Sequence, residues 1–250
     1  MQHQASLSGQ LALVTGASSG IGRAIAIDLA RQGATVIATG RQLKRLNELR
    51  EQAPPGSIVP LALDVCDNDQ VDALPRQLPK NHEAVDILVN NAAQDVGGRT
   101  RFDQSDPDEL SLVIQTNLIG LMRVTRAVVP AMLQRGRGTI VNIGSTNALR
   151  PTPTMAAYTA SKAGVHALTD ALRADFAKEG LRVIEVVPGL TRTEFAQTRM
   201  RGDSEKARAF FEKFPGALEP QDVADAVVYA VTRPAHVCIQ QIVVTPWFQW

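Results

Sequence analysis

The sequence predicts an α/β protein built on one doubly wound parallel sheet of about seven strands, with helices on both faces. Two observations lead to this fold class. Short apolar runs rich in Val, Ile and Leu alternate with longer amphipathic segments along the chain, as expected for buried parallel strands between two helix layers. The chain has 250 residues, 44 % of them hydrophobic, which suits one large domain better than two small ones. No repeat or linker divides it, so we expect residues 1–250 to form a single domain.

The individual elements follow from this alternation. Segments apolar on both faces are the predicted strands: Leu11–Thr15, Thr35–Ala38, Ile58–Leu63, Asp86–Asn90, Thr139–Ile143, Arg182–Val187 and Gln241–Val244. Amphipathic segments between them are the predicted helices: Gly20–Gln32, Leu43–Gln52, Asp69–Leu78, Pro107–Gln134, Ala157–Lys178 and Pro220–Thr232. Residues 190–216 interrupt the alternation. Long connections at the carboxyl end of a parallel sheet are usually functional, so we expect a substrate lid there.

Charge and cysteine usage exclude several classes of function. The formal net charge is +1 with no long basic run, which argues against nucleic-acid or membrane partners. No apolar stretch approaches the length of a membrane span, and residues 1–7 lack the features of a signal peptide. Cys66 and Cys238 fit neither a disulfide framework nor a metal site, and the histidines show no metal spacing. We therefore expect a cytoplasmic protein without a metal.

A glycine-rich loop lies between the first predicted strand and the first predicted helix. Gly16 permits a tight turn, and Gly20 and Gly22 allow the backbone and the helix end to approach a pyrophosphate. The spacing G-x-x-x-G-x-G differs from the G-x-G-x-x-G of longer dehydrogenases, and an ordinary glycine turn remains an alternative. The other loop residues expected to contact the cofactor are Ser18, Ser19 and Ile21.

The end of the second predicted strand bears on the choice of cofactor. NAD-binding chains usually carry a carboxylate there, but this chain reads Gly40-Arg41, with no carboxylate before Glu48. Arg41 is placed to bind a 2′-phosphate, which favours NADP(H), although it could simply begin a solvated helix. Asp64 and Val65 follow the third strand, where an adenine edge would lie, and Asp64 could equally be a turn or cap residue.

Tyr158 and Lys162 are four residues apart, so they share one face of a predicted helix. A nearby ammonium favours the phenolate, so we expect Lys162 to lower the pKa of Tyr158 toward the range useful for acid–base catalysis. Ser145 ends the fifth predicted strand. An exposed helix face is the alternative for the Tyr-x-x-x-Lys pair alone, and Ser145 makes that alternative weak.

Together these segments resemble the short-chain dehydrogenase/reductase family. The residues that carry the resemblance are Thr15-Gly16-x-x-x-Gly20-Ile21-Gly22, Asn90-Asn91-Ala92-Ala93, Asn117, Ser145, Tyr158-x-x-x-Lys162 and Pro188-Gly189-Leu190-Thr191-x-Thr193. They occur in the family's order, and the combination is far more specific than any single piece.

The resemblance implies roles for these residues and a Rossmann-like fold. Tyr158 would be the acid–base, Ser145 would bind the substrate oxygen, and Asn117 would hold a water on the proton path. Lys162 would also hold the nicotinamide ribose. The remaining residues that would contact the cofactor are Asn91, Ala92, Pro188, Gly189, Leu190, Thr191 and Thr193, of which Thr191 could equally belong to a simple proline–glycine turn. The family's long helices pair across a two-fold axis, which implies a homo-oligomer, most simply a tetramer.

Two departures from the family pattern concern the substrate. Ala93 stands where the family has glycine, so the loop from Gln94 to Arg101 could be displaced. The chain also ends in an aromatic tail, Trp247–Trp250, which either packs on its own sheet or reaches a neighbouring subunit's pocket. The residues expected at the substrate are Gln94, Ser145, Thr146, Asn147, Met155, Tyr158, Leu190 and Trp247.

The sequence thus predicts an NADP(H)-dependent oxidoreductase that interconverts a ketone or aldehyde with an alcohol. Carbonyl reductases and secondary-alcohol or β-hydroxy acid dehydrogenases all fit. A catalytically idle dinucleotide sensor or scaffold is the alternative from another class, because function resides in the site and not in the fold.

Overall fold

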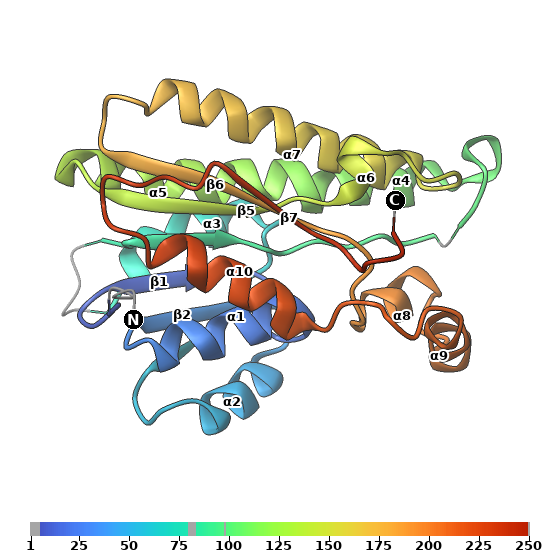
Figure 1. The fold of residues 1–250 in the computed structure, drawn as a ribbon, viewed down its shortest axis with the longest axis horizontal. Helices are drawn as coiled ribbons and strands as arrows, with labels where there is room; N and C mark the ends of the chain where they lie inside the picture. Colours follow the sequence, from blue (N-terminus) through green and yellow to red (C-terminus); the bar gives the residue numbers. More distant parts are fainter. Residues whose placement is uncertain (1–5, 80–83, 98, 250) are drawn as a thin grey trace.

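The computed structural model describes residues 6–79, 84–97 and 99–249 and confirms the predicted fold class (Figure 1). Seven strands form one sheet in the order β3-β2-β1-β4-β5-β6-β7, and every neighbouring pair is parallel. The strands are β1 (Leu11–Val14), β2 (Thr35–Gly40), β3 (Ile58–Ala62), β4 (Ile87–Asn90), β5 (Gly138–Ile143), β6 (Leu181–Pro188) and β7 (Gln241–Val244). The strand order reverses between β1 and β4, which is where such sheets bind ligands.

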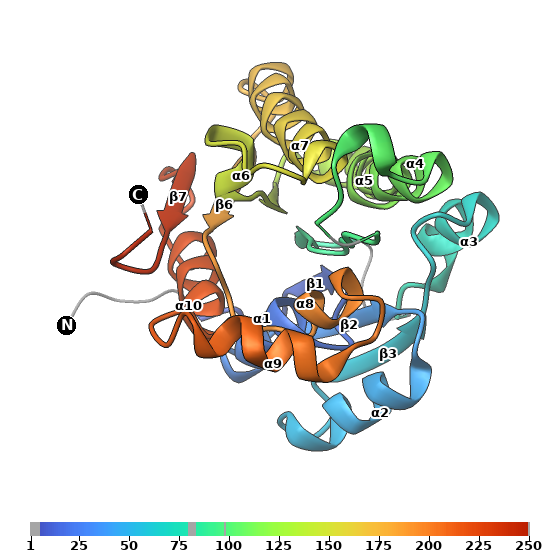
Figure 2. The same ribbon diagram turned by 90° about the vertical axis from the view of Figure 1, so that its right-hand side faces the viewer.

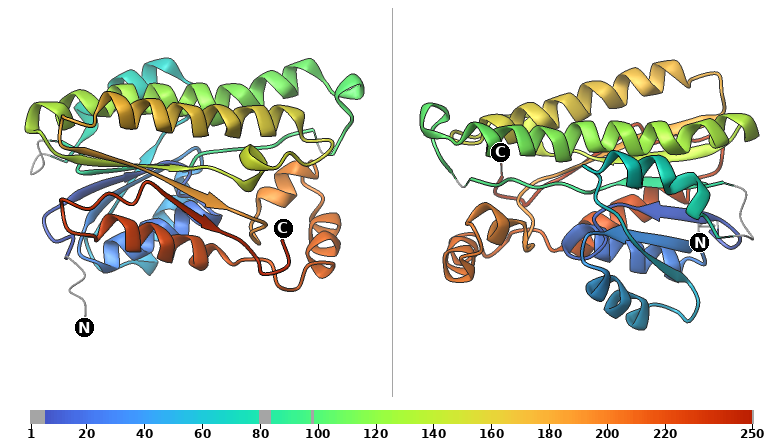
Figure 3. Two further views of the ribbon diagram at one scale, coloured as in Figure 1. Left: turned by 45° about the horizontal axis from the view of Figure 1, so that its top comes forward. Right: turned by 180° about the vertical axis from the view of Figure 1, so that it is seen from behind.

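Helices cover both faces of the sheet, as the sequence predicts (Figures 1 and 3). One face carries α1 (Gly20–Arg31), α2 (Leu43–Gln52) and α10 (Pro220–Val231). The other carries α3 (Asn68–Ala73), the long helical segment α4–η3–α5 and α7 (Ala156–Asp175). Two apolar clusters, one on each face, form the core. The strands are therefore buried on both sides, which explains their continuous apolar sequences.

The long helical segment consists of α4 (Pro107–Ile114), a π-helical turn η3 (Gln115–Gly120) and α5 (Leu121–Arg135). It starts where expected, because the Asp106 carboxylate accepts a hydrogen bond from the Asp108 amide and Pro107 occupies the first turn. It ends at Gly136, whose φ of 61° is left-handed. The π turn was not predicted, and such turns are frequent at functional sites.

Two other predicted helices differ in length from the observed ones. The segment predicted as Asp69–Leu78 becomes α3 followed by the 3₁₀ turn η1 (Leu74–Gln77), because Pro75 lacks an amide hydrogen for the α-helical pattern. The helix α7 ends at Asp175 rather than Lys178, and turns lead to Gly180, which has a φ of 75°.

The helical segment Pro107–Arg135 is long and apolar enough to cross a membrane by length and composition alone, which differs from the sequence expectation. Half of its most apolar window, 50 %, is buried inside the protein. Core helices of soluble proteins have the same properties, so this segment carries no argument for a membrane.

The insertion at 190–216 is largely helical and lies beyond the carboxyl ends of the strands (Figure 2). It contains α8 (Phe195–Arg199) and α9 (Ser204–Glu212), while the short α6 (Thr146–Leu149) follows β5. Ala196, Ala207, Phe211 and Ala217 form a small apolar cluster of their own within this region. The insertion thus has a small apolar cluster of its own and lies at the carboxyl edge of the sheet (Figure 2).

Candidate active site

A cavity of about 1040 Å³ opens at the carboxyl ends of the strands, between the sheet and the insertion. It brings together all of the site residues predicted from the sequence except three: Gly22, Asn117 and Trp247. It also contains Arg99, which from the sequence alone could either hold an acidic substrate or be a solvated loop residue. Residues from the first glycine loop to the end of the chain therefore meet in one place.

Contacts with the loop after β4 fix the shape of the glycine loop. The Asn91 side chain donates to the carbonyls of Thr15 at 2.9 Å and Gly16 at 3.2 Å. A Cβ on Gly22 would lie 2.4 Å from the Asn91 Nδ2 atom and 2.5 Å from the Gly16 carbonyl oxygen. Asn91 and Gly22 thus have a structural role here: they hold the loop closely packed beneath the cavity.

The amino end of α1 faces the cavity without a side-chain cap. Ser19 is the N-cap residue and its hydroxyl makes no capping hydrogen bond, while Ser19, Gly20 and Ile21 line the cavity. Free amides at a helix N-terminus, together with the helix dipole, bind phosphate groups. The Thr193 side chain from the insertion lies opposite, 3.2 Å from where a Gly20 Cβ would be.

Two arginines lie at the far end of the cavity. Arg41 and Arg45 both line it, and Arg45 pairs with Glu194 of the insertion. Gly40 ends β2 without a side chain, and a Cβ there would lie 3.3 Å from the Ser18 hydroxyl. The end of β2 therefore carries no carboxylate that would bind the ribose 2′-hydroxyl of NAD. Arg41, which follows it, is exposed and free to bind a phosphate of a ligand in the cavity.

Asp64 and Val65 follow β3 and line the same end of the cavity. The Asp64 carboxylate accepts a hydrogen bond from the Cys66 amide at 2.9 Å, which is a turn-forming contact. Both readings of Asp64, in the turn and beside the cavity, are compatible with this position.

Tyr158, Ser145 and Lys162 lie together at the ends of β5 and α7. Tyr158 is 9 % exposed and Lys162 is 3 % exposed. The Lys162 ammonium lies 5.9 Å from the centre of the Tyr158 ring and donates to the Ile143 carbonyl at 2.7 Å. The Ser145 side chain caps α6 by accepting from the Asn147 amide, and it also hydrogen-bonds the Tyr158 hydroxyl.

The ionisation of this group differs from the sequence expectation. Burial raises the pKa of Tyr158 above its ordinary value, and the hydrogen bond with Ser145 and the charge of Arg199 only partly oppose that rise. Lys162, expected to lower the pKa of Tyr158, instead directs its ammonium to the Ile143 carbonyl. Burial lowers the pKa of Lys162 itself to about 8, and the carboxylate of Glu185 acts in the opposite direction.

Asn117 is fully buried in the π turn, and its side chain does not line the cavity. It accepts from the Gln94 amide at 2.8 Å and donates to the Gln94 carbonyl at 2.9 Å and the Ser161 hydroxyl at 3.1 Å. This side chain therefore anchors the loop after β4 to the helix layer. The adjacent Ala93 is outside the left-handed region of φ, so glycine is not required there.

An ion pair connects this loop to the insertion. Arg199 Nε donates to Asp95 Oδ2 at 2.6 Å, and the two side chains are only 10 % and 6 % exposed. Arg199 also lies over the Phe195 ring, whose centre is 5.5 Å from that of Tyr158. Sequence reasoning missed this pair because 104 residues separate its members.

The carboxyl tail turns into the cavity of its own chain. Phe248 stacks on Phe214 with ring centres 6.0 Å apart, and both line the cavity. Gln249 accepts from the Leu190 amide at 2.6 Å and donates to the Thr146 hydroxyl at 3.2 Å. Trp247, expected to line the pocket, points away and is 85 % exposed, because the chain turns after Pro246. Trp250 lies outside the described residues.

Known proteins share this arrangement. Residues 10–204 match the short chain dehydrogenase family. The chain belongs to the short-chain dehydrogenase/reductase family. An uncharacterized oxidoreductase of Staphylococcus epidermidis is 34 % identical over 238 residues, which cover 95 % of this chain and 97 % of that protein. One from Staphylococcus aureus is 34 % identical over 240 residues, covering 96 % and 98 %.

Solved structures of family members have a fold similar to that of this chain. The closed form of a serine dehydrogenase complexed with NADP⁺ has a TM-score of 0.90 and 37 % identity, with 94 % of each chain covered. The serine dehydrogenase from Escherichia coli has a TM-score of 0.81 and 34 % identity, covering 94 % of this chain and 97 % of that one. A metagenomic short-chain oxidoreductase in complex with NADP has a TM-score of 0.82 and 32 % identity, covering 98 % and 100 %.

Short-chain dehydrogenase/reductases act on CH–OH and C=O groups with a nicotinamide dinucleotide, and this chain is such an enzyme. The residues present fit that cofactor. The uncapped start of α1 fits its phosphates, and a Cβ on Gly16 would come 2.8 Å from the Ala92 Cα atom, so the close backbone approach depends on glycine.

Proposed function

We propose that the protein is an NADP(H)-dependent oxidoreductase that interconverts a ketone or aldehyde with the corresponding alcohol. The observation that carries this proposal is the meeting of Ser145, Tyr158 and Lys162 at one end of a cavity whose other end holds an uncapped helix start. When bound, the cofactor supplies or accepts the hydride. Tyr158 gives a proton to the substrate oxygen or takes one from it, and Ser145 hydrogen-bonds the same oxygen.

Arg41 and Arg45 support NADP(H) over NAD(H). Both line the end of the cavity beyond Gly40, and Gly40 places no carboxylate at the end of β2. A guanidinium binds a phosphate through charge-assisted hydrogen bonds. Two of the similar solved structures are described as NADP complexes, which agrees with this assignment.

Within this class we propose small hydroxy acids, or the matching oxo acids, as substrates. Arg99 and Arg199 line the cavity, and Asp95 neutralises only one of them. The remaining cationic group suits a carboxylate. Two similar structures are serine dehydrogenases, and serine is an alcohol that carries a carboxylate.

The experiment is a substrate screen with both cofactors. Purified enzyme is assayed by nicotinamide absorbance with hydroxy acids, oxo acids, and uncharged ketones and alcohols. We expect turnover with NADP(H) and a preference for the acids. Tyr158→Phe should reduce kcat by about 10²–10⁴-fold while cofactor binding persists. Binding of NADPH without turnover of any substrate would instead favour a dinucleotide sensor or scaffold.

We further propose a cytoplasmic homotetramer. Leu112, Ile119 and Met122 leave apolar surface exposed along the α4–η3–α5 segment, next to α7 (Figure 3). The two cysteines, Cys66 and Cys238, are free thiols, which suits a reducing compartment. Light scattering over micromolar concentrations tests the assembly, and a mass of 26.9 kDa throughout would contradict it.

A further inference from the structure

Four ionisable side chains are spaced every four residues along α7: Tyr158, Lys162, His166 and Asp170. Residues at this spacing lie on one face of a helix. The row begins at the buried Tyr158, 9 % exposed, and ends at Asp170, whose side chain is 56 % exposed. It therefore leads from the reaction site to the protein surface.

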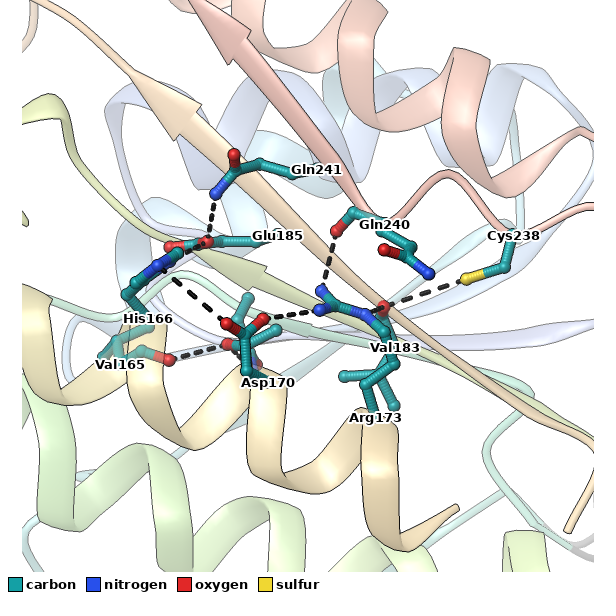
Figure 4. A network of polar contacts seen from close by, with 11 residues as sticks. Val165, His166, Asp170, Arg173, Val183, Glu185, Cys238, Gln240 and Gln241 are labelled. Atoms are coloured by element: carbon teal, nitrogen blue, oxygen red, sulfur yellow. Dashed lines mark hydrogen bonds and ion pairs between the residues drawn. The ribbon is translucent and has the colours of Figure 1, made fainter. Parts of the chain in front are cut away.

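A buried carboxylate on β6 lies beside this row (Figure 4). Glu185 is 1 % exposed, and its Oε2 atom contacts His166 Nδ1 at 2.7 Å and accepts from Gln241 Nε2 at 2.8 Å. Its Oε1 atom has no hydrogen-bond partner among the described residues. Burying a carboxylate is costly unless charge or hydrogen bonds compensate it, so a group of this kind in the sheet needs an explanation.

The unpartnered oxygen points to the backbone that carries the active-site residues. A Cβ on Gly144 would lie 2.4 Å from Glu185 Oε1. Gly144 joins Ile143, whose carbonyl accepts from Lys162, to Ser145. The carboxylate thus lies directly behind the segment that holds both Lys162 and Ser145, on the side away from the cavity.

Few other charges reach this cluster. Burial lowers the pKa of Lys162, and the charge of Glu185 opposes this by favouring the ammonium. His166 contacts Glu185 and lies 4.0 Å from Asp170, which is itself paired with Arg173. The charges that act on the pKa of Tyr158 are those of Arg199 and Asp95 rather than that of Glu185.

We propose that Glu185 and His166 form a positioning pair for Lys162, in which the buried carboxylate behind the Ile143–Ser145 backbone favours the ammonium form of the lysine and His166 holds the carboxylate in place through their 2.7 Å contact. Neither member lines the cavity, and both act through the lysine. His166 is 33 % exposed at its side chain, so the pair also connects Lys162 to solvent. The catalytic part rests on the proposed function, but the charge state of Lys162 does not.

The direct test is the pKa of Lys162, read by NMR. The chain has six lysines, so lysine labelled with ¹³C at its ε-carbon gives few signals, and Lys162→Met assigns the one of interest. In the wild type this signal should titrate near pH 8. In Glu185→Gln it should titrate about one unit lower, because the carboxylate charge is gone while the side-chain shape is kept.

The His166 variants supply an independent readout. His166→Leu removes a partner of the carboxylate and should move the Lys162 titration in the same direction as Glu185→Gln. His166→Asn retains a donor near the Nδ1 position and should restore it. Asp170→Asn is the matched control, since it removes the exposed carboxylate at the other end of the row and should leave the titration unchanged.

Activity provides the second measurement. The alkaline limb of the pH profile of kcat/KM should shift to lower pH in Glu185→Gln and His166→Leu. The shift should equal the change in the Lys162 titration. The proposal is overturned if the Lys162 titration does not move in folded Glu185→Gln. If that variant does not fold, the same result in folded His166→Leu overturns it. Absence of any turnover in the wild type would reject the proposed function and leave the NMR result decisive for the pair.

Discussion

Replacing Asp95 by alanine should destabilise the protein far more than the loss of one surface contact would. In the wild type the side chains of Arg199 and Asp95 are only 10 % and 6 % exposed. The variant therefore leaves the buried Arg199 without its partner. Removing one member of a buried ion pair typically costs about 3–5 kcal/mol, because the remaining charge stays buried and uncompensated. That is a large part of the roughly 5–15 kcal/mol that stabilises most proteins.

The effect should also be seen in thermal unfolding. For a chain of this size each kcal/mol moves Tm by about 2–4 °C, so Asp95→Ala should lower Tm by roughly 6–20 °C. The matched control is Asp103→Ala, because the Arg101–Asp103 pair is also an arginine–aspartate contact but its side chains are 72 % and 60 % exposed. That pair should contribute no more than about 1 kcal/mol.

The double variant Asp95→Leu/Arg199→Met separates charge from packing. If burial of an unpaired cation causes the loss, replacing both charges by apolar side chains should recover most of it. Urea or thermal unfolding of the four proteins measures this directly. Equal small losses in Asp95→Ala and Asp103→Ala would refute the reasoning, since the two contacts would then contribute alike despite their different burial.

Three further predictions concern the site. Arg41→Ala should raise KM for NADPH about tenfold or more and leave KM for NADH nearly unchanged, because a charge-assisted contact contributes roughly 1.5–3 kcal/mol; a wild type that prefers NADH would contradict the assignment. Relative to Lys162→Met, the free energy of unfolding of the wild type should rise between about pH 8 and 10.5. Folding lowers the pKa of Lys162, so the unfolded chain binds more protons in that range. If the pKa of Lys162 were not lowered by folding, the difference in unfolding free energy between the two proteins would not change with pH. Deleting Trp247–Trp250 removes the Phe248 and Gln249 contacts and should change substrate selectivity, as steady-state kinetics on matched acids would reveal; unchanged selectivity in a folded truncation would reject a role for the tail in the pocket.

The fold could be predicted well because parallel strands buried on both sides produce an unambiguous apolar pattern. The seven predicted strands correspond to β1–β7 with small differences at their ends. The elements that could not be predicted depend on single-residue effects. Pro75 ends an α-helix early, and the π turn around Asn117 has no sequence pattern distinct from the helices on either side.

In the candidate site, too, local features could be predicted and long-range contacts could not. Residues in local motifs, such as Tyr158 and Lys162, could be placed because their spacing within one helix determines that they share a face. The Asp95–Arg199 pair and the Gln249–Leu190 contact could not, because each joins segments far apart in the chain. The ionisation of Tyr158 also required the structure, since the extent of burial decides the direction of its pKa.

Gly144 and Glu185 have a consequence for how this protein can change through evolution. A Cβ at position 144 would lie 2.4 Å from the nearer Glu185 oxygen, so a side chain there displaces the carboxyl end of Glu185. A substitution at 144 therefore disturbs the carboxylate that His166 and Gln241 hold, and a smaller residue at 185 removes this conflict. The two positions should therefore covary among homologues.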